Sequence, residues 1–233
     1  GEPRFADVLR AVDAAGIERL RFATSHPKDL TDEVIGLFAT LPSLMPALHL
    51  PVQSGSNRIL SAMNRRYTRE HYLGLIEKLR RARPDIALST DIIVGFPGET
   101  EEDFMDTYRL VEEVGYSQVF TFIYSKREGT PAAEMDDDTP REVIQECFDR
   151  LVDLVQRKAF EANQAELGAT VPVLVEGTSK RDDYILAGKS PKNQTVHAPV
   201  PAGADAASLV GRIVPVTIEE ARTWYLSGTI VHA

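Results

Sequence analysis

Four segments of the sequence combine glycine or proline with side chains that donate and accept hydrogen bonds, and each follows a run of apolar residues. They are 24–27 (TSHP), 52–56 (VQSGS), 94–100 (VGFPGET) and 123–130 (IYSKREGT). The apolar runs have the composition of buried strands. Because parallel α/β folds bind their ligands beyond the carboxyl ends of the strands, these four segments predict one ligand-binding edge.

The segment 52–56 offers the most varied chemistry of the four. Gln53 and Ser54 can each hydrogen-bond a ribose or a carboxylate, and Gly55 lets another group approach the backbone closely. The alternative is that Gln53, Ser54 and Ser56 cap a short helix at 57–63. For Gln53, which follows a buried strand, we favour contact with a ligand, whereas for Ser56 both interpretations stay open.

The strand at 86–94 and the turn after it supply two further candidates. Gly95, Pro97 and Gly98 predict a tight turn whose free amides could meet an adenine or an anion. Asp91 lies within the apolar run, where an unpaired carboxylate would cost about several kcal/mol. We therefore expect Asp91 to have a hydrogen-bonding partner, which is either a ligand or a neighbouring strand.

His26 and Cys147 are the remaining reactive side chains. His26, directly before Pro27, is either an acid, base or substrate contact or a histidine that stabilises a turn. Cys147 shares a helix face with Ile144 and Leu151, so we expect a packed side chain rather than a ligand or nucleophile. The sequence contains one cysteine, which excludes an internal disulfide framework and a cysteine-ligated cluster within this chain.

Strand and helix patterns alternate through the first two thirds of the sequence. The expected strands are 18–24, 47–52, 86–94 and 119–124. Among the helices between them, Thr100 with Asp103 predicts a capping box at one helix start. Repeated strand–helix units predict a parallel sheet, and four strands are too few for a closed eight-stranded barrel. They form either part of an incomplete barrel or an open doubly wound sheet.

After Gly168 the pattern becomes one of short β-rich runs separated by Gly, Pro, Asp and Ser. Five such runs, without a helix between them, predict a small OB-like barrel. We place the domain boundary here, with one domain over 1–168 and the other over 169–233. The five runs are 171–175, 184–187, 195–198, 213–218 and 224–231.

Composition and charge narrow the class of protein. The chain has 43% hydrophobic and 26% charged residues, as expected for a globular protein. It starts at Gly1 without a Met, a basic segment or an apolar segment, which predicts that it has no signal peptide and that its start is not native. The single cysteine favours a reducing, cytoplasmic setting. A net charge of −9 argues against nucleic-acid binding over the whole surface, so any RNA contact needs a local basic patch.

Taken together, the strand-end segments resemble the methylthiotransferase branch of the radical-SAM enzymes. The resemblance rests on 21–30 (RFATSHPKDL), 49–56 (HLPVQSGS), 89–104 (STDIIVGFPGETEEDF) and 122–133 (FIYSKREGTPAA), in this order and spacing. Beyond Gly168 the chain resembles the TRAM domain that ends these proteins. The implied fold is α/β: a partial (β/α) radical-SAM barrel followed by a small five-stranded all-β OB-like TRAM barrel.

The resemblance also implies an activity for the full-length parent. Members add a methylthio group to C2 of an N6-modified adenosine in the anticodon loop, using S-adenosyl-L-methionine (SAM) and two 4Fe-4S clusters. The cluster cysteines are absent from this chain, so the chain alone is expected to hold no cofactor and to be inactive. The residue pattern at 49–56 favours the branch that acts on dimethylallyladenosine in tRNA. The alternatives are the branches acting on ribosomal protein S12 or on threonylcarbamoyl-adenosine, an aldolase-like barrel, and a non-catalytic RNA-binding module.

Carried over residue by residue, the resemblance implies a set of SAM contacts. Gln53 and Ser54 should border the ribose and the amino-acid end of SAM. Ile93 and Gly95 should present a strand to its adenine, with Asp91 at the head of that motif, where the family usually has glycine. From the last strand, Tyr124 should flank the adenine. The expected cofactor-binding residues are thus Gln53, Ser54, Asp91, Ile93, Gly95 and Tyr124.

The expected RNA contacts lie after Gly168, where six basic side chains balance six acidic ones. The segment 188–193 (GKSPKN) resembles the phosphate-contacting segment of the family. The alternative is that its lysines are scattered surface residues that only increase solubility. The expected partner is a tRNA anticodon stem-loop, with no membrane. Self-association through an unpaired strand at 18–24 is also expected. The expected RNA-binding residues are Lys180, Arg181, Lys189, Lys192, Asn193 and Arg222.

Overall fold

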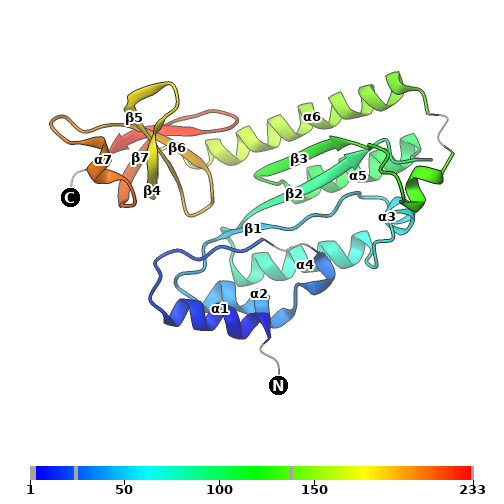
Figure 1. The fold of residues 1–233 in the computed structure, drawn as a ribbon, viewed down its shortest axis with the longest axis horizontal. Coiled ribbons are helices and arrows are strands. Elements are labelled where there is room, and N and C mark those ends of the chain that lie inside the picture. The colour runs from blue at the N-terminus through cyan, green and yellow to red at the C-terminus, as the bar shows by residue number, and fades with distance from the viewer. Residues whose placement is uncertain (1–3, 24–25, 137–138, 232–233) are drawn as a thin grey trace. The chain divides into compact units, whose positions relative to one another are not determined.

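A computed structural model describes residues 4–23, 26–136 and 139–231 of the chain (Figure 1). The chain divides into two compact units, residues 1–158 and 159–233, and each is described by itself below. No helix among the described residues is long and apolar enough to cross a membrane.

The first unit is built on a parallel three-stranded sheet in the order β1 (Ala47–His49), β2 (Ala87–Val94) and β3 (Gln118–Ile123). Along β2, buried residues alternate with half-buried ones, so one face packs against helices and the other carries Asp91 and Ile93. The strand expected at 18–24 is wrong for the described residues. Only Leu20 and Ala23 form isolated parallel bridges, to Leu44 and His49, because this segment lies at the edge of the sheet.

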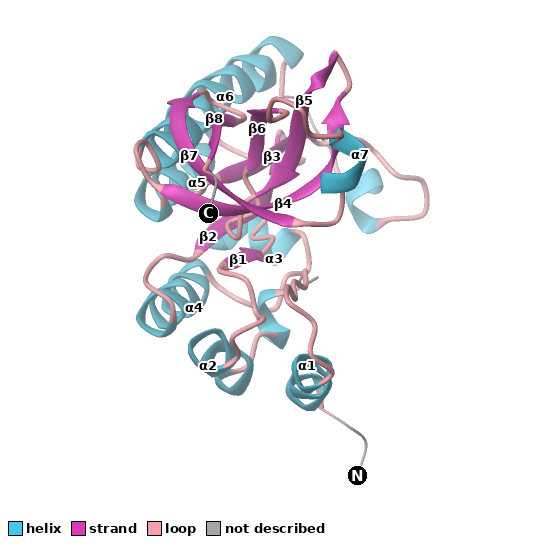
Figure 2. Cartoon of the chain, turned by 90° about the vertical axis from the view of Figure 1, so that its left-hand side faces the viewer, coloured by secondary structure: helices cyan, strands magenta, loops and turns pink. Residues whose placement is uncertain are grey.

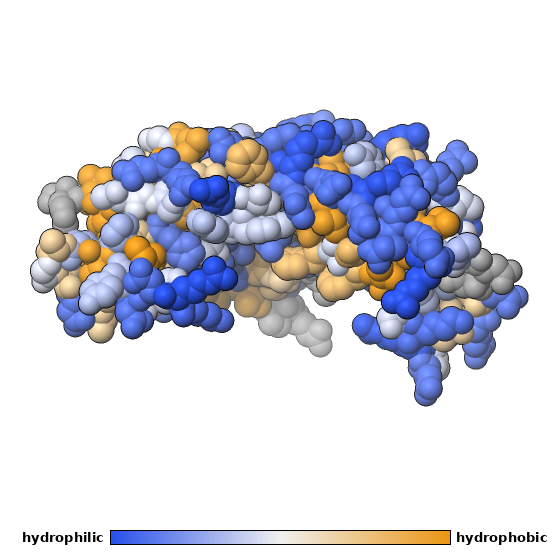
Figure 3. All heavy atoms as spheres, turned by 90° about the horizontal axis from the view of Figure 1, so that it is seen from above, coloured by the Kyte–Doolittle hydropathy of each residue, from blue (hydrophilic) through white to orange (hydrophobic). Residues whose placement is uncertain are grey.

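Helices cover the buried face of the sheet, and α1, α2 and α4 lie side by side in Figures 1 and 2. The predicted capping box is confirmed at the start of α5, where the Thr100 hydroxyl accepts from Asp103 N and the Asp103 carboxylate accepts from Thr100 N. The surface seen over α6 is largely hydrophilic (Figure 3). The helices are α1 (Phe5–Ala14), α2 (Asp32–Thr40), α3 (Asn57–Ala62), α4 (Arg69–Ala82), α5 (Glu101–Val114) and α6 (Arg141–Gln164), with 3₁₀ turns at Pro27–Asp29 and Pro131–Glu134.

The second unit is a closed barrel of five strands in the order β4-β5-β6-β8-β7, which confirms the predicted five-stranded barrel (Figure 2), although one short helix lies between β6 and β7 where none was expected. Neighbouring strands pair antiparallel, except that β6 and β8 close the barrel in parallel. Its elements are β4 (Thr170–Ser179), β5 (Asp182–Lys189), β6 (Thr195–Pro199), a short helix α7 (Ala206–Leu209), β7 (Ile213–Ala221) and β8 (Leu226–Ile230). Its core consists of Val173, Val196, Ala198, Val216, Ile218, Ala221 and Leu226.

Candidate functional site

The carboxyl ends of the parallel strands meet at one edge of the sheet, as the sequence predicts. The chain leaving β1 stays paired with β2, since Gln53 N donates to Asp91 O and Ile93 N donates to Gln53 O, both at 2.9 Å. On the other side, Tyr124 N donates to Val94 O at 2.8 Å. Gln53, the end of β2 and Tyr124 are therefore neighbours along this edge, which we call the strand-end edge.

Gln53 has an unusual backbone and a side chain that makes no hydrogen bond to the described residues. Its φ is 73°, in the left-handed region that residues other than glycine rarely adopt. Only 9% of the residue is exposed, and among the described residues its side-chain amide has no hydrogen-bonding partner. Strained backbone is tolerated where the surroundings impose it, often at a ligand site. This combination supports the interpretation of Gln53 as a ligand contact rather than a helix cap.

Tyr124 carries a buried polar atom without a partner at the same edge. Its hydroxyl is buried and has no hydrogen-bonding partner among the described residues. The ring is held edge-on against Phe96, with centroids 5.2 Å apart. A buried hydroxyl without a partner is destabilising and calls for an explanation such as a missing ligand. Gln53 and Tyr124 thus offer an amide and a hydroxyl to a molecule bound at the strand-end edge.

Ser54 and Gly55, in contrast, are engaged within the protein. Ser54 is fully buried, and its hydroxyl lies 3.2 Å from Thr107 Oγ1 of α5. Gly55 N donates to the same Thr107 Oγ1 at 2.8 Å. A Cβ at Gly55 would lie 2.4 Å from the carbonyl oxygen of Asp106, so the glycine allows α5, rather than a ligand, to approach the backbone.

Ser56 joins this loop to a buried carboxylate. It caps α3 by accepting from Ile59 N, and it donates to Asp103 Oδ1 at 2.6 Å, so the capping alternative holds for Ser56. Asp103 also accepts bonds from the Arg58 guanidinium and from the Thr100 amide and hydroxyl. Burial alone would raise the pKa of Asp103, but these bonds outweigh it and hold the pKa well below its usual range.

The amide of Gly95 is not free, which corrects the expectation for the turn after β2. Gly95 has a φ of 72°, and its N–H donates to Glu99 Oε2 at 2.6 Å. Burial raises the pKa of Glu99 to about 7, and the bond from Gly95 opposes this only in part. The end of β2 is therefore closed by the side chain of Glu99, which belongs to its own loop.

Asp91 and Ile93 share the face of β2 that the helices leave open. Asp91 Oδ1 lies 3.5 Å from His49 Nε2 on β1, so its expected partner is on a neighbouring strand. The other ring nitrogen of His49, Nδ1, lies 3.0 Å from Ser89 Oγ. Phe120 of β3 packs edge-on against the same imidazole, with centroids 5.7 Å apart. His49, which sequence reasoning missed, is the last residue of β1, and a histidine at the end of a strand was the available signal.

His26 stabilises a turn in this structure. Its Nδ1 accepts from Lys28 N at 3.2 Å, and its ring lies edge-on to Tyr67, with centroids 5.0 Å apart. Burial and then the nearby Arg65 charge lower the pKa of His26, which keeps the imidazole neutral near pH 7. Residues 24 and 25 of the same segment lie outside the described residues.

The residues of this chain do not fit an iron–sulfur cluster. Cys147, the one cysteine of the sequence, is 7% exposed on α6. Burial and then the Glu101 carboxylate raise the pKa of its thiol to about 11, which disfavours the thiolate that a cluster needs. In the described part of the chain, no group of three His, Cys, Asp or Glu side chains is placed to hold a metal ion.

The basic residues expected to bind RNA fall into two groups at opposite ends of β5. Lys180 and Arg181 occupy the β4–β5 turn, beside Asp182. Lys189 is the last residue of β5, about 23 Å further along the strand at 3.3 Å per residue. The structure therefore does not bring all six expected residues together.

The second group surrounds the end of α6. Lys189 Nζ donates to Thr195 Oγ1 at 2.9 Å, and Lys192 pairs with Glu166 at 2.5 Å, so GKSPKN is not a free polar loop. Asn163 accepts from the β5–β6 turn and donates to the carbonyl of Arg222 at 2.7 Å, which holds that turn and the β7–β8 turn next to each other. Asn193 lies in the first of these turns, with a φ of 66°.

Exposed aromatic rings of the barrel were missed by sequence reasoning. Trp224, next but one to Arg222, is 52% exposed, and Tyr225 is 38% exposed with its ring against His197. Tyr184, at the other end of the barrel, is 82% exposed. Interleaved aromatic and basic side chains in a β-rich segment were the available signal.

Comparison with protein families matches one family model within each structural unit. Residues 2–111 match the model of the radical SAM superfamily, and residues 164–231 match that of the TRAM domain. Among solved structures, the fold is similar to coproporphyrinogen III oxidase (HemN) from Escherichia coli, described as a radical SAM enzyme. The TM-score is 0.54 at 14% identity, covering 80% of this chain and 51% of that one.

Curated relatives match almost the whole chain. It is 50% identical over 97% of its length to the tRNA-2-methylthio-N(6)-dimethylallyladenosine synthase of Acetivibrio thermocellus, covering 46% of that protein. It is 48% identical over 99% of its length to the synthase of the same name from Carboxydothermus hydrogenoformans, covering 52% of it. The chain thus spans about half the length of the curated relatives it matches. The chain therefore consists of a radical SAM superfamily segment followed by a TRAM domain, and along almost its whole length it is similar to these synthases.

Proposed function

We propose that this chain is part of a tRNA methylthiotransferase that adds a methylthio group to C2 of an N6-modified adenosine in an anticodon loop. The observation that carries the proposal is the identity of 50% over 97% of the chain to a synthase named for that product. The order of a radical SAM segment and a TRAM domain supports the same activity. Since tRNA is the substrate, the protein would act in the cytoplasm.

The strand-end edge would bind SAM through two polar groups that make no hydrogen bond to the described residues. The side-chain amide of Gln53 can bond ribose hydroxyls, and the Tyr124 hydroxyl can bond the adenine or the ribose. Ile93, on the open face of β2, would offer an apolar surface to the adenine. Ser54 and Gly95 would act indirectly, by fixing the loops that carry Gln53 and the end of β2.

The protein residues position reactants rather than perform the radical step. In such an enzyme, SAM and the iron–sulfur clusters supply the radical, the sulfur atom and the methyl group. The cluster ligands must come from outside this chain, because its one cysteine is buried and protonated. The barrel would bind the stem-loop through the basic turns at the end of α6 and the exposed Trp224.

The activity is tested with the cluster-loaded full-length parent and tRNA lacking the methylthio group. We expect mass spectrometry of the digested tRNA to show methylthiolated adenosine that depends on SAM. Modification of ribosomal protein S12 with unmodified tRNA would instead support the S12 branch and overturn the proposal. Failure to modify either substrate would remove the methylthiotransferase assignment altogether.

The proposed cofactor contact is tested at Gln53. Gln53→Ala keeps the strained backbone but removes the amide, whereas Gln53→Gly removes both. In the cluster-loaded full-length parent, both variants should bind SAM more weakly in equilibrium dialysis. The glycine variant should be the more stable of the two, because glycine relieves strain of about 1 kcal/mol. Gln145→Ala, on the exposed side of α6, is the control. Unchanged SAM affinity in both Gln53 variants would remove this residue from the site.

A further inference from the structure

A loop beside the strand-end edge carries two adjacent arginines to which neither the fold nor the proposed function has given a role. The arginine loop, residues 63–68 (MNRRYT), connects α3 to α4, and Arg69 follows it as the first residue of α4. Among the described residues, Arg65 and Arg66 form no ion pair. In a chain with a net charge of −9, two neighbouring cations without carboxylate partners indicate a place for an anion.

The arginine loop is held in place rather than loosely attached. Asn64 adopts a left-handed backbone with a φ of 56°, and Arg65 N donates to Leu60 O at 2.8 Å. Tyr67 is 7% exposed, and its hydroxyl donates to Val52 O at 3.0 Å. Val52 immediately precedes Gln53, so this bond fixes the loop directly beside the proposed SAM contact.

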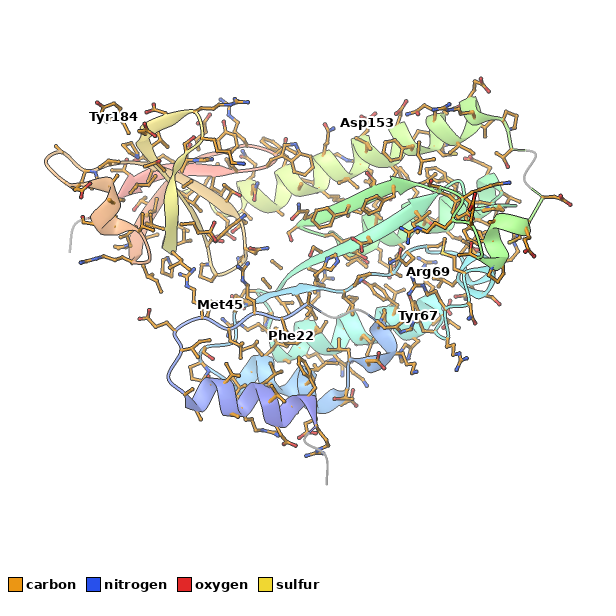
Figure 4. The ribbon with its side chains drawn as sticks, viewed as in Figure 1. Phe22, Met45, Tyr67, Arg69, Asp153 and Tyr184 are labelled. Carbon is orange, nitrogen blue, oxygen red and sulfur yellow. The ribbon has the colours of Figure 1, made fainter. Side chains whose placement is uncertain are left out.

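Two buried guanidinium nitrogens near the loop have no acceptor. The Nε atoms of Arg65 and Arg69 are buried and have no hydrogen-bonding partner among the described residues. Arg69 is oriented by other bonds, since its terminal nitrogen pairs with Glu113 at 3.0 Å and its backbone N–H donates to Asn57 Oδ1 at 2.7 Å. Tyr67 and Arg69 lie close together beside α3 in Figure 4. The planar donor array of arginine matches phosphate or carboxylate oxygens, often with two bonds at once.

We propose that Arg65 and Arg66 bind backbone phosphates of the RNA on either side of the nucleotide presented to the strand-end edge. The inference rests on the proposed function, because it takes RNA as the substrate. A nucleotide that is splayed out of a loop has a phosphate on each side, so two adjacent cations match it. A SAM carboxylate would supply only one negative group for the two arginines. The radical SAM segment would then bind RNA itself, in addition to the barrel.

The test is a salt titration of anticodon stem-loop binding to the chain, measured by fluorescence anisotropy. Each phosphate contact on a single strand contributes about −0.7 to the slope of log K against log salt. Arg65→Gln/Arg66→Gln should therefore flatten the slope by about 1.4. Between 50 and 200 mM salt, the loss of affinity should become about sevenfold smaller than in the wild type. Arg65→Lys/Arg66→Lys keeps both charges and should keep the slope.

The matched control is Arg81→Gln/Arg83→Gln, which removes the same charge at the other end of α4. It should leave the slope unchanged, and circular dichroism should show that every variant is folded. If the glutamine variant at 65 and 66 binds RNA with the wild-type affinity and slope, this inference is overturned. It is also overturned if the control flattens the slope equally. Either result leaves the proposed function standing. Loss of SAM binding by the same variant of the cluster-loaded parent, with an unchanged RNA slope of the chain, would assign the arginines to SAM instead. Absence of RNA binding by the wild type would overturn the RNA part of the proposed function itself.

Discussion

Replacing Asp103 with alanine should destabilise the first unit more than any other single change of charge in α5. The carboxylate accepts from Ser56 Oγ at 2.6 Å, from the Thr100 amide at 2.9 Å and from the Thr100 hydroxyl at 2.5 Å, as well as from the Arg58 guanidinium. The three neutral donors contribute about 1 kcal/mol each. The half-exposed Arg58 adds little, because water can replace its partner. The expected loss is about 3 kcal/mol, or a melting temperature lower by about 6 to 12 °C.

Two optical signals separate the units in this experiment. Urea unfolding followed by circular dichroism at the helix band reports the first unit, which contains most of the helices. The fluorescence of Trp224, the one tryptophan of the sequence, reports the barrel. Asp106→Asn is the matched control, because Asp106 lies one turn along α5 and makes only a surface pair with Arg109. Equal shifts of the helix-band midpoint in the Asp103 and Asp106 variants would refute the reasoning.

The same carboxylate predicts a pH dependence. Burial raises the pKa of Asp103, but the bonds from Arg58, Ser56 and Thr100 lower it further, so the folded-state pKa lies below that of the unfolded chain. The stabilisation is therefore fully present above the ordinary aspartate pKa of about 4 and is lost as the pH falls below it. The difference in unfolding free energy between wild type and Asp103→Ala should stay constant from pH 7 to 5 and shrink below pH 4.

Four further outcomes are expected. Gly55→Ala should lower the helix-band midpoint strongly, because its Cβ would lie 2.4 Å from Asp106 O; an unchanged midpoint would mean that α5 can move away. Burial raises the pKa of Glu99 from 4.5 to about 7. The free energy of unfolding of the wild type should therefore fall by about 2 to 3 kcal/mol as the pH rises from 5 to 8. The urea midpoint of Glu99→Gln should not show this fall. Lys192→Met leaves the partly buried Glu166 without its cationic partner and should lower the tryptophan-detected urea midpoint. Adding Glu166→Gln removes the unpaired charge and should restore the midpoint. The purified chain should be colourless after anaerobic reconstitution with iron and sulfide, and stoichiometric bound iron would contradict the reading of its single cysteine.

Features that depend on residues close together in the chain could be predicted from the sequence. The capping box of Thr100 and Asp103, the packed position of Cys147 and the five strands of the barrel all depend on spacing within one element. Hydrophobic periodicity and cap residues record such local preferences directly. The segment 18–24 has the same apolar character but fails as a strand, since its place at the sheet edge leaves it few partners.

Features that join distant residues could not be predicted. Ser54 and Thr107 are 53 positions apart, and nothing in either segment indicates that they share a hydrogen bond. The left-handed backbone of Gln53 was also hidden, because glycine or asparagine normally marks that conformation. The two arginines of the loop at 63–68 were visible in the sequence, but their lack of ion-pair partners emerges only from three-dimensional packing.

The closure of the barrel has a consequence for the order of folding. Thr170 of β4 bonds Thr217 of β7, 47 positions later, and the parallel pairing of β6 with β8 completes the ring. Contacts between such distant residues form slowly, because the loop between them must first be ordered. No ring exists until β8 has left the ribosome, whereas the sheet of the first unit needs only strands that emerge much earlier. During synthesis the strand-end edge is therefore assembled before the barrel closes, and a stop codon after the first unit but before Leu226 would leave that unit complete and the barrel open.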